Sequence, residues 1–523
     1  MAVIATSRML GIASIPWTTT LASICTVVLT GMLLINIKSI LRWCRIYWYL
    51  RNVPRPFKQW SFFTVLDMWN SMSKMDGDLS YTAKAFKYFK MMFENAMHED
   101  VSVMYFGTTP MLMGYSPDAV EGILSKNENQ NKPFLYQFMA PWNGDGILTL
   151  ETSLWRIRRK AFTPAFHFKI LDEYVPVMNR RANALAHKLR LQEDYVDVLP
   201  VVRTAGLGIF YETALNVKVD EEKEVEQHFL LGAMEEIGAK IVSRMLNPLL
   251  WYDFLYNLTN DAKQFYHYAR HLREYNTEVM CRKIEEYNAG GKEENKDSNR
   301  FIDIMMRMLK EDHSLRDVDV VDELVAAFIG GFETTAISTS FVLHLLGSHP
   351  EAQRKVHEEL DAVFGDGPDG SVSHEDIKQL KYMDCVVKEA LRLYPPLPII
   401  AREFQTDTQI GKYTIPSGTV GLVMIYFLHR NPNVYESPDD FIPERFLDNK
   451  DRHPYAFVPF AGGLRNCIGQ KYAKTEEKIL LTHLLRQFKV ESETPTKSLT
   501  IDMQLMLKTT EQLRVKFIPR KSQ

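Results

Sequence analysis

One cysteine stands in a segment that suits it to bind a ligand. Residues 460–469 read Phe-Ala-Gly-Gly-Leu-Arg-Asn-Cys-Ile-Gly and place Cys467 among glycines, an arginine and a phenylalanine. Gly462 and Gly463 permit a tight backbone turn, and Gly469 lets the following segment approach closely. Residues 474–485 carry apolar side chains at helical spacing, so Cys467 lies near a helix start, where the helix dipole favours a thiolate. A buried free cysteine in a glycine-rich turn is the alternative interpretation.

The spacing F-x-x-G-x-R-x-C-x-G in this segment resembles the haem-binding loop of the cytochrome P-450 superfamily and matches each of its fixed positions. The resemblance implies that Cys467 is the axial thiolate ligand of a haem iron. It also implies that Arg465 approaches a haem propionate, that Phe460 packs beside the sulfur and that Gly469 completes the cofactor-binding loop. Thiolate ligation pushes electron density onto iron and favours O–O cleavage.

A long apolar run contains a second set of reactive residues. Residues 324–346 carry a single charge, Glu333, among small and hydroxyl-bearing residues. A second membrane span is possible by length, but the polar content favours a helix through a large core. The sequence at 330–335 resembles the P-450 motif [AG]-G-x-[DE]-T-[TS], which implies that Glu333 and Thr334 relay protons to dioxygen. Alternatively, Thr334 only bonds a backbone carbonyl within the helix.

Further residues resemble the family's propionate partners. Trp155 and Arg159 have helical i, i+4 spacing and face one way; their W-x-x-x-R spacing resembles a propionate clamp, although a solvated basic helix face is the alternative. The segment 397–402 resembles one that lines the substrate pocket and sends Arg402 to a propionate. Arg158 and Lys160 flank the clamp, and we expect them to offer a basic face to an acidic reductase or to be ordinary surface charges.

Three other residues are expected to be structural. Glu389 and Arg392 form an E-x-x-R spacing, and Arg445 follows in the segment 441–446. In resembling proteins these three side chains lock together beneath the haem loop.

Two segments most resemble the fatty-acid omega-hydroxylase (family four) branch of the superfamily. They read Ala-Phe-His-Phe at 165–168 and His-Pro-Tyr-Ala-Phe-Val-Pro-Phe at 453–460. Many members of that branch esterify a glutamate of the central helix to haem, but Gly330 occupies this position here. The resemblance therefore implies haem b that is not covalently attached.

The sequence patterns of the helices and strands that must position these residues predict a mainly α fold with a small β-sheet region. Residues 101–106 and 111–115 alternate around a Gly-Thr-Thr-Pro turn and predict a β-hairpin, with partner strands at 409–413 and 420–424. Ser116-Pro117 and Ser373 each predict a helix start. The resemblance implies the cytochrome P-450 fold with an N-terminal transmembrane helix.

The N-terminal residues predict a membrane anchor. Residues 9–37 lack charge, and a span of about 12–37 is long enough to cross a bilayer. A cleaved signal peptide is the alternative, but Lys38, Arg42 and Arg45 follow the run instead of a cleavage site. By the positive-inside rule these charges predict that the chain after the span lies in the cytosol. We therefore expect an anchor and proline hinge at 1–56, a catalytic domain at 57–523 and a single-pass location in the endoplasmic reticulum membrane.

Composition narrows the function classes. Of 523 residues, 46% are hydrophobic and 24% charged, typical of a folded globular chain. The net charge of −3 gives no basic field, so nothing favours nucleic acid. The five cysteines are scattered without C-x-x-C spacing, which predicts a reducing compartment without disulfides or zinc.

The resemblance implies an NADPH-driven haem-thiolate monooxygenase that acts on a hydrophobic, fatty-acid-like substrate. Neither a Gly-rich dinucleotide loop nor an iron–sulfur cysteine pattern occurs in the sequence, so NADPH would act through a partner flavoprotein reductase. The alternatives are a haem-thiolate isomerase or dehydratase and a catalytically silent haem or lipid binder. The aromatic segment 247–256 is expected either to rest on the bilayer or to pack in the core. Pocket candidates by resemblance are Phe134, Phe138, Trp142, Phe332, Leu397, Ile399 and Ile400.

Overall fold

The computed structural model describes residues 26, 37–56, 61–75, 77–217, 224–289, 300–311, 316–365, 370–448 and 452–520. The chain divides into two units, Met1–Asn52 and Val53–Gln523. In the first unit, residues 37–50 are helical, while the predicted span at about 12–37 lies almost wholly outside the described residues. Across those described residues, no helix combines the length and the apolar character needed to cross a membrane.

Helices make up most of the second unit, as predicted. Several begin where the sequence places a cap: Ser116 and Ser373 each accept a backbone N–H of the first turn of the helix that follows. The helices are α2 (Ser61–Ser73), α3 (Tyr81–Ala96), α4 (Pro117–Leu124), α5 (Ala140–Asn143), α6 (Thr152–Phe162), α7 (Phe168–Arg190), α8 (Val198–Ala214), α9 (Glu224–Leu246), α10 (Asp253–Tyr256), α11 (Asn260–Ala289), α12 (Phe301–Glu311), α13 (Asp317–Gly331), α14 (Glu333–Ser348), α15 (Pro350–Phe364), α16 (His374–Gln379), α17 (Lys381–Leu393), α18 (Ile425–Leu428) and α19 (Gln470–Gln487).

The strands form small sheets. They are β1 (Val101–Phe106), β2 (Thr109–Gly114), β3 (Val196–Asp197), β4 (Ile400–Glu403), β5 (Thr408–Ile410), β6 (Tyr413–Ile415), β7 (Val420–Val423), β8 (Phe488–Ser492), β9 (Ile501–Met503), β10 (Leu507–Thr509) and β11 (Arg514–Pro519). The four-stranded sheet has the order β1-β2-β7-β4.

The predicted hairpin is confirmed as β1 and β2, which turn at Gly107 with a φ of 59°. The partner predicted at 420–424 is also confirmed, because β7 pairs with β2 in parallel. The partner predicted at 409–413 is wrong. Gly411 (φ 53°) makes a local turn there, and β5 and β6 pair with each other instead.

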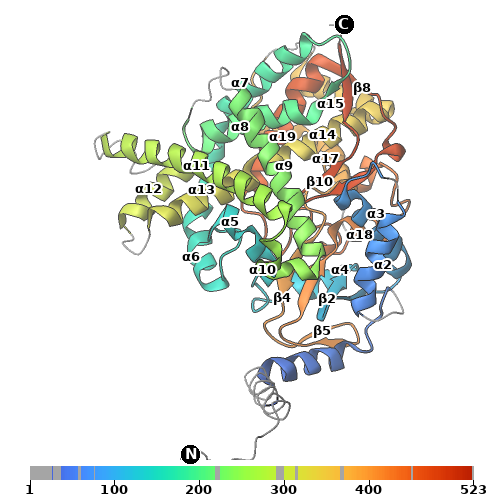
Figure 1. The fold of residues 1–523 in the computed structure, drawn as a ribbon. Coiled ribbons are helices and arrows are strands. Elements are labelled where there is room, and N and C mark those ends of the chain that lie inside the picture. Colours follow the sequence, from blue (N-terminus) through green and yellow to red (C-terminus); the bar gives the residue numbers. More distant parts are fainter. Residues whose placement is uncertain are drawn as a thin grey trace, which may run out of the picture. The chain divides into compact units, whose positions relative to one another are not determined.

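Two helices run through the core of the second unit (Figure 1). In α14 the buried residues are continuous from Thr335 to Leu346, and in α19 they are continuous from Thr475 to Gln487. The prediction of a core helix at 324–346 is thus confirmed, but the helix is not continuous. It breaks at Phe332 (φ −131°, ψ −36°), between α13 and α14.

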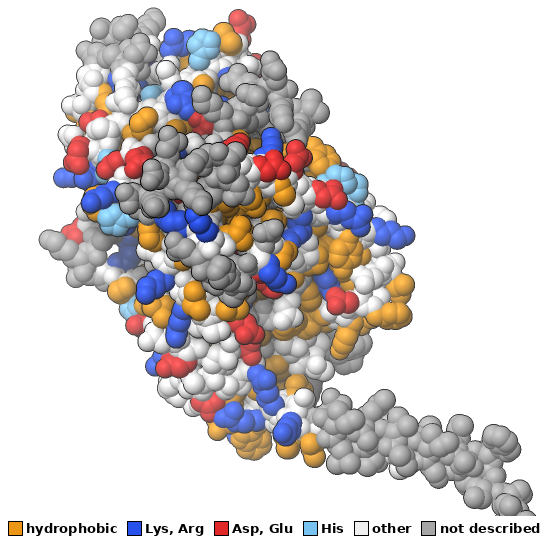
Figure 2. Space-filling model, turned by 90° about the vertical axis from the view of Figure 1, so that its left-hand side faces the viewer, with side chains coloured by type: hydrophobic (Ala, Val, Ile, Leu, Met, Phe, Trp, Pro, Cys, Tyr) orange, Lys and Arg blue, Asp and Glu red, His pale blue; other side chains and the backbone are white. Residues whose placement is uncertain are grey.

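Charges of both signs are mixed on one face of the molecule. On the face drawn in Figure 2, Lys and Arg side chains are interspersed with Asp and Glu side chains. This distribution agrees with the small net charge of the chain and differs from the basic stripe typical of nucleic-acid-binding proteins.

Candidate functional site

The loop that carries Cys467 is held by backbone geometry. The Cys467 N–H donates to the Phe460 carbonyl at 2.9 Å, and Gly469 is the N-cap of α19. Gly463 has a φ of 70°, and a Cβ added there would overlap the backbone carbonyl of Leu124 at the end of α4. Only glycine satisfies both conditions, so the predicted turn places the sulfur at the start of α19.

The Cys467 side chain is accessible to solvent although its sulfur lies deep in the protein. Burial raises the pKa of its thiol, while the Gly469 N–H and Arg159 lower it. The predicted preference for a thiolate is therefore outweighed by burial in the protein alone. A metal ion reverses this balance, because a coordinating thiol is deprotonated outright.

Helix α6 brings both predicted clamp residues to this loop. Arg159 donates from Nη1 to the Asn466 carbonyl at 2.7 Å and from Nη2 to its Oδ1 at 2.8 Å. The buried Trp155 ring lies 4.7 Å from the Arg465 guanidinium carbon. Trp155 and Arg159 therefore contact different residues, Arg465 and Asn466, which directly precede Cys467 in the sequence.

Arg402 and Arg465 lie together, and each is nearly fully buried. Arg402 donates to its neighbour's carbonyl at Ala401, at 2.9 Å, and Arg465 donates to the Leu150 carbonyl. Yet Arg402 Nε and Arg465 Nε and Nη1 are buried without a hydrogen-bond partner among the described residues. Burial, followed by the charge of Arg402, lowers the pKa of Arg465 to about 10.

Lys132 interacts with these two arginines, and no sequence pattern indicated it. Burial, followed by the charges of Arg402 and Arg465, holds the pKa of Lys132 well below its usual value. Its Nζ lies 4.3 Å from the centre of the Tyr136 ring. None of the ion pairs found among the described residues includes Lys132, Arg402 or Arg465.

This cation cluster (Lys132, Arg402 and Arg465) shows which ligand fits. The unpartnered N–H groups of Arg402 and Arg465 favour an anion beside them, because an uncompensated buried charge is destabilising. A group that carries carboxylates on one edge and a metal that accepts a thiolate would satisfy the cluster and Cys467 together. Haem has both features, so the residues present fit it.

The two predicted proton-relay residues follow each other at the break between α13 and α14. Glu333 is buried, and its Oε2 accepts from Arg203 Nε at 2.6 Å. Arg203 also faces Glu235, which is 42% exposed, at 3.4 Å. The Thr334 hydroxyl donates to the Gly330 carbonyl at 3.2 Å, which is the alternative that the sequence left open.

The expected structural triad is present. Arg392 donates to Glu389 through Nε and Nη2 at 2.8 and 2.7 Å, and Arg445 Nε donates to Glu389 Oε1 at 2.9 Å. Glu389 and Arg392 are fully buried, and the Arg392 guanidinium also binds the carbonyls of His429 and Asp440. The triad thereby joins α17 to the segment before the haem loop.

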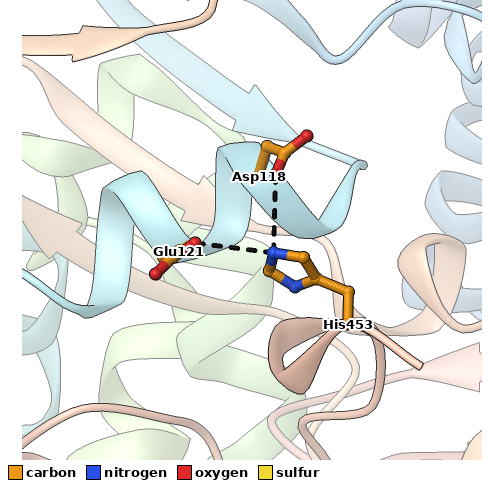
Figure 3. Close-up of side chains that lie close together, drawn as sticks. All are labelled: Asp118, Glu121 and His453. Carbon is orange, nitrogen blue, oxygen red and sulfur yellow. Dashed lines mark ion pairs between the residues drawn. The ribbon is translucent and has the colours of Figure 1, made fainter. Parts of the chain in front are cut away.

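A surface cluster involves a histidine that precedes that loop in the sequence (Figure 3). His453 Nε2 is 3.4 Å from Asp118 Oδ1 and 3.5 Å from Glu121 Oε2, both on α4. The backbone N–H of Tyr455 donates to His453 Nδ1, so Nε2 carries the hydrogen in the neutral ring and is not free to bind a metal. The cluster therefore ties α4 to the segment that leads into the loop.

Comparison with known proteins gives consistent results. The family model described as cytochrome P450 matches residues 79–517. The chain is similar to "Cytochrome P450 4c3" of Drosophila melanogaster, with 35% identity over 79% of this chain and 81% of that protein. It is also similar to "Cytochrome P450 4V2" of Mus musculus, with 35% identity over 81% and 83%. Among solved structures, that of the "cytochrome P450DA heme domain" superposes with a TM-score of 0.73 at 22% identity and covers 90% of this chain and 98% of that one.

Proposed function

Because this chain belongs to the cytochrome P450 family, we propose that it is a haem-thiolate monooxygenase that inserts one atom of dioxygen into a hydrophobic, lipid-like substrate, with electrons from NADPH through a separate reductase. Thiolate-ligated haem supplies the activation of dioxygen. The observation that carries the proposal is the accessible Cys467 sulfur beside buried arginine N–H groups that lack a partner.

The proposed cofactor-binding residues each have a separate task. Cys467 ligates the iron, and Phe460 and Gly469 fix the loop around it. Arg402, Arg465 and Lys132 neutralise the haem carboxylates, while the Trp155 ring supports Arg465 and Arg159 orients Asn466 beside the sulfur. If the carbon monoxide complex of the reduced protein lacked the red-shifted Soret band of thiolate ligation, the role of Cys467 would be refuted.

Proton delivery is assigned to Glu333 and Thr334. Glu333 is buried, but an ion-pair chain leads from it toward the surface, because Arg203 contacts both Glu333 and the half-exposed Glu235. Thr334 lies at the helix break with its hydroxyl on the Gly330 carbonyl. Glu333→Gln and Thr334→Ala should both lower the ratio of product formed to NADPH consumed, which oxygen-electrode and product measurements report together.

The cofactor is proposed to be bound without a covalent bond. A Cβ at Gly330 would have no side chain or distant backbone atom within 4 Å, so the first side-chain atom of Gly330→Glu would meet no clash. Acid and solvent extraction should release unmodified haem from the wild type, and Gly330→Glu should retain a fraction after turnover. Haem that stays on the wild-type chain would show that another carboxylate forms the bond.

The substrate is proposed to be a fatty-acid-like lipid. Of the pocket candidates, Leu397 and Ile399 are half-buried, whereas Phe332 and Trp142 are almost fully buried within the core. A lipid screen that reads the haem spin-state shift would test the substrate class. A shift with steroids or small aromatics but with no fatty acid of any length would refute it.

The proposed membrane contact includes the segment 247–256. Phe254 is 75% exposed and Tyr252 69%, while Tyr256 is buried against the body. This division supports the bilayer alternative for the exposed rings. In vesicle-bound protein, brominated lipids should quench a fluorophore on a cysteine at position 254 but not one at the exposed position of Leu447. From the sequence pattern we also propose an N-terminal membrane anchor, an endoplasmic reticulum location and a catalytic domain in the cytosol.

The proposed reductase surface is the exposed side of α6. Leu154 and Ile157 are exposed there, and Lys160 lies beside them. The expectation for Arg158 was wrong, because Arg158 turns inward and pairs with Glu323 at 3.5 Å. Lys160→Glu should slow reduction by the reductase and weaken its salt dependence, whereas Lys412→Glu, an exposed lysine of the β5–β6 turn, should do neither.

One experiment separates this proposal from the isomerase or dehydratase and from the silent binder. With reductase added, a monooxygenase consumes NADPH and dioxygen in step with oxygenated product. An isomerase or dehydratase and a silent binder do not consume NADPH and dioxygen in proportion to product. If the two were not consumed in that proportion, the monooxygenase proposal would be refuted.

A further inference from the structure

A short loop connects three helices with the cation cluster. Residues 144–150, named here the clasp loop, join α5 to α6. Gly144 has a φ of 60°, and a Cβ added there would overlap the Asp322 carboxylate. A Cβ on Gly146 would lie 2.5 Å from the Asp322 carbonyl oxygen. The loop backbone therefore lies directly against α13, at a distance that only glycine allows.

Two consecutive carboxylates of α13 bind this backbone. The Asp145 N–H donates to Asp322 Oδ2 at 2.8 Å, and the Ile147 N–H donates to Glu323 Oε2 at 2.9 Å. Asp322 is 5% exposed and Glu323 1%. Hydrogen bonds from backbone N–H groups to buried carboxylates are stronger than neutral ones, so the pair is suited to fix the loop position.

Arginines from two other helices complete the arrangement. Arg273 of α11 donates to Asp322 Oδ1 at 2.7 Å and to the Trp142 carbonyl at 3.0 Å. Arg158 of α6 lies 3.5 Å from Glu323 Oε1. Burial raises the pKa of Glu323 to about 7, whereas the Ile147 N–H and Arg158 lower it. The loop N–H and Arg158 thus favour the ionised carboxylate of Glu323, whereas burial favours its protonated form.

The far end of the clasp loop contacts the candidate site. The Leu150 carbonyl accepts a hydrogen bond from Arg465, the arginine whose Nε and Nη1 have no partner among the described residues. Asn143, the last residue of α5, donates from Nδ2 to the Thr149 hydroxyl oxygen at 2.9 Å, which ties the end of the loop to its beginning. A shift of the loop at Ile147 would therefore move the acceptor that orients Arg465.

We propose that Asp322 and Glu323 are positioning residues, which hold the clasp loop so that the Leu150 carbonyl orients Arg465 toward the carboxylate of the bound cofactor. The inference rests on the proposed function, because the cofactor is the proposed haem. It assigns to the first half of α13 a role separate from the proton relay proposed at the start of α14.

Haem loss from the full-length holoenzyme to an excess of a scavenging apoglobin tests the proposal. Glu323→Ala should speed haem loss about tenfold, equivalent to about 1.4 kcal/mol. Glu323→Gln, which keeps an acceptor for the Ile147 N–H, should stay within about threefold of the wild type. Asp319→Ala is the matched control, because Asp319 lies on the same helix but pairs with Arg316 at the surface, and it should leave the rate unchanged.

A double-mutant cycle separates positioning from general weakening. If Glu323 acts through Arg465, Glu323→Ala should have no further effect on haem loss in an Arg465→Gln background. Additive effects, or equal rates for Glu323→Ala and Asp319→Ala, would overturn the proposal while the monooxygenase function stands. A wild-type protein without the thiolate Soret band would overturn both.

Discussion

Replacing Lys132 with methionine should make the protein lose haem faster. Burial, followed by repulsion between like charges, destabilises the cation cluster: burial and then the charge of Arg402 lower the pKa of Arg465 to about 10, which corresponds to roughly 3 kcal/mol. Burial and the charges of both arginines lower the pKa of Lys132 in the same way. A carboxylate would offset this destabilisation, and a hydrogen bond between charged groups contributes about 1.5–3 kcal/mol. Without Lys132, haem release should accelerate roughly 10- to 100-fold.

The assay follows transfer of haem to an excess of apoglobin by the change in the Soret band. Lys126→Met is the matched control, since Lys126 is an exposed lysine shortly before Lys132 in the same segment. Lys132→Arg should retain most of the wild-type stability of the complex because it keeps the charge. Release from Lys132→Met at the wild-type rate would refute the assignment of Lys132 to a haem carboxylate.

Three further predictions concern stability. Gly331→Ala should lower the free energy of unfolding by about 1–3 kcal/mol, because its Cβ would lie 2.5 Å from Phe210 Cδ2; thermal unfolding checks this. Glu389→Gln should cost about 3–5 kcal/mol in urea denaturation, since it leaves buried arginines uncompensated, whereas Glu351→Gln, at an exposed pair, should cost under about 1 kcal/mol. Burial, followed by nearby arginines, lowers the pKa of His429 to about 3. The histidine of the unfolded chain therefore binds a proton at a higher pH than His429 of the folded protein. The free energy of unfolding should fall as the pH drops from 6.5 toward 3, by up to about 1.4 kcal/mol per pH unit. His429→Gln should reduce this pH dependence.

Residues with a local signal were predicted well. The turn around Gly463, the β1–β2 hairpin and the cap at Ser116 each depend on neighbours within a few positions. Local chemistry also explains the wrong strand partner, because the turn at Gly411 lets two short strands pair without the distant sheet.

Residues defined by distant contacts were not predicted. The sequence at Lys132 is an ordinary polar loop, and its importance follows from the charges of Arg402 and Arg465 far along the chain. Likewise, the i, i+4 spacing indicated that α6 carries a basic face but not that Arg158 turns inward to Glu323. Pairing across more than a hundred residues leaves no periodicity that one sequence can reveal.

The contact between α6 and the haem loop also has a consequence for biosynthesis. Arg159 and Asn466 are separated by 307 positions, so the first half of the site leaves the ribosome long before the second. At about 5–20 residues per second, the interval is roughly 15–60 s. During that time α6 has no loop to bind, and the nascent chain can capture haem only after nearly all of it has been synthesised. Haem insertion should therefore be post-translational, and a ribosome-bound chain that ends before residue 460 should bind none.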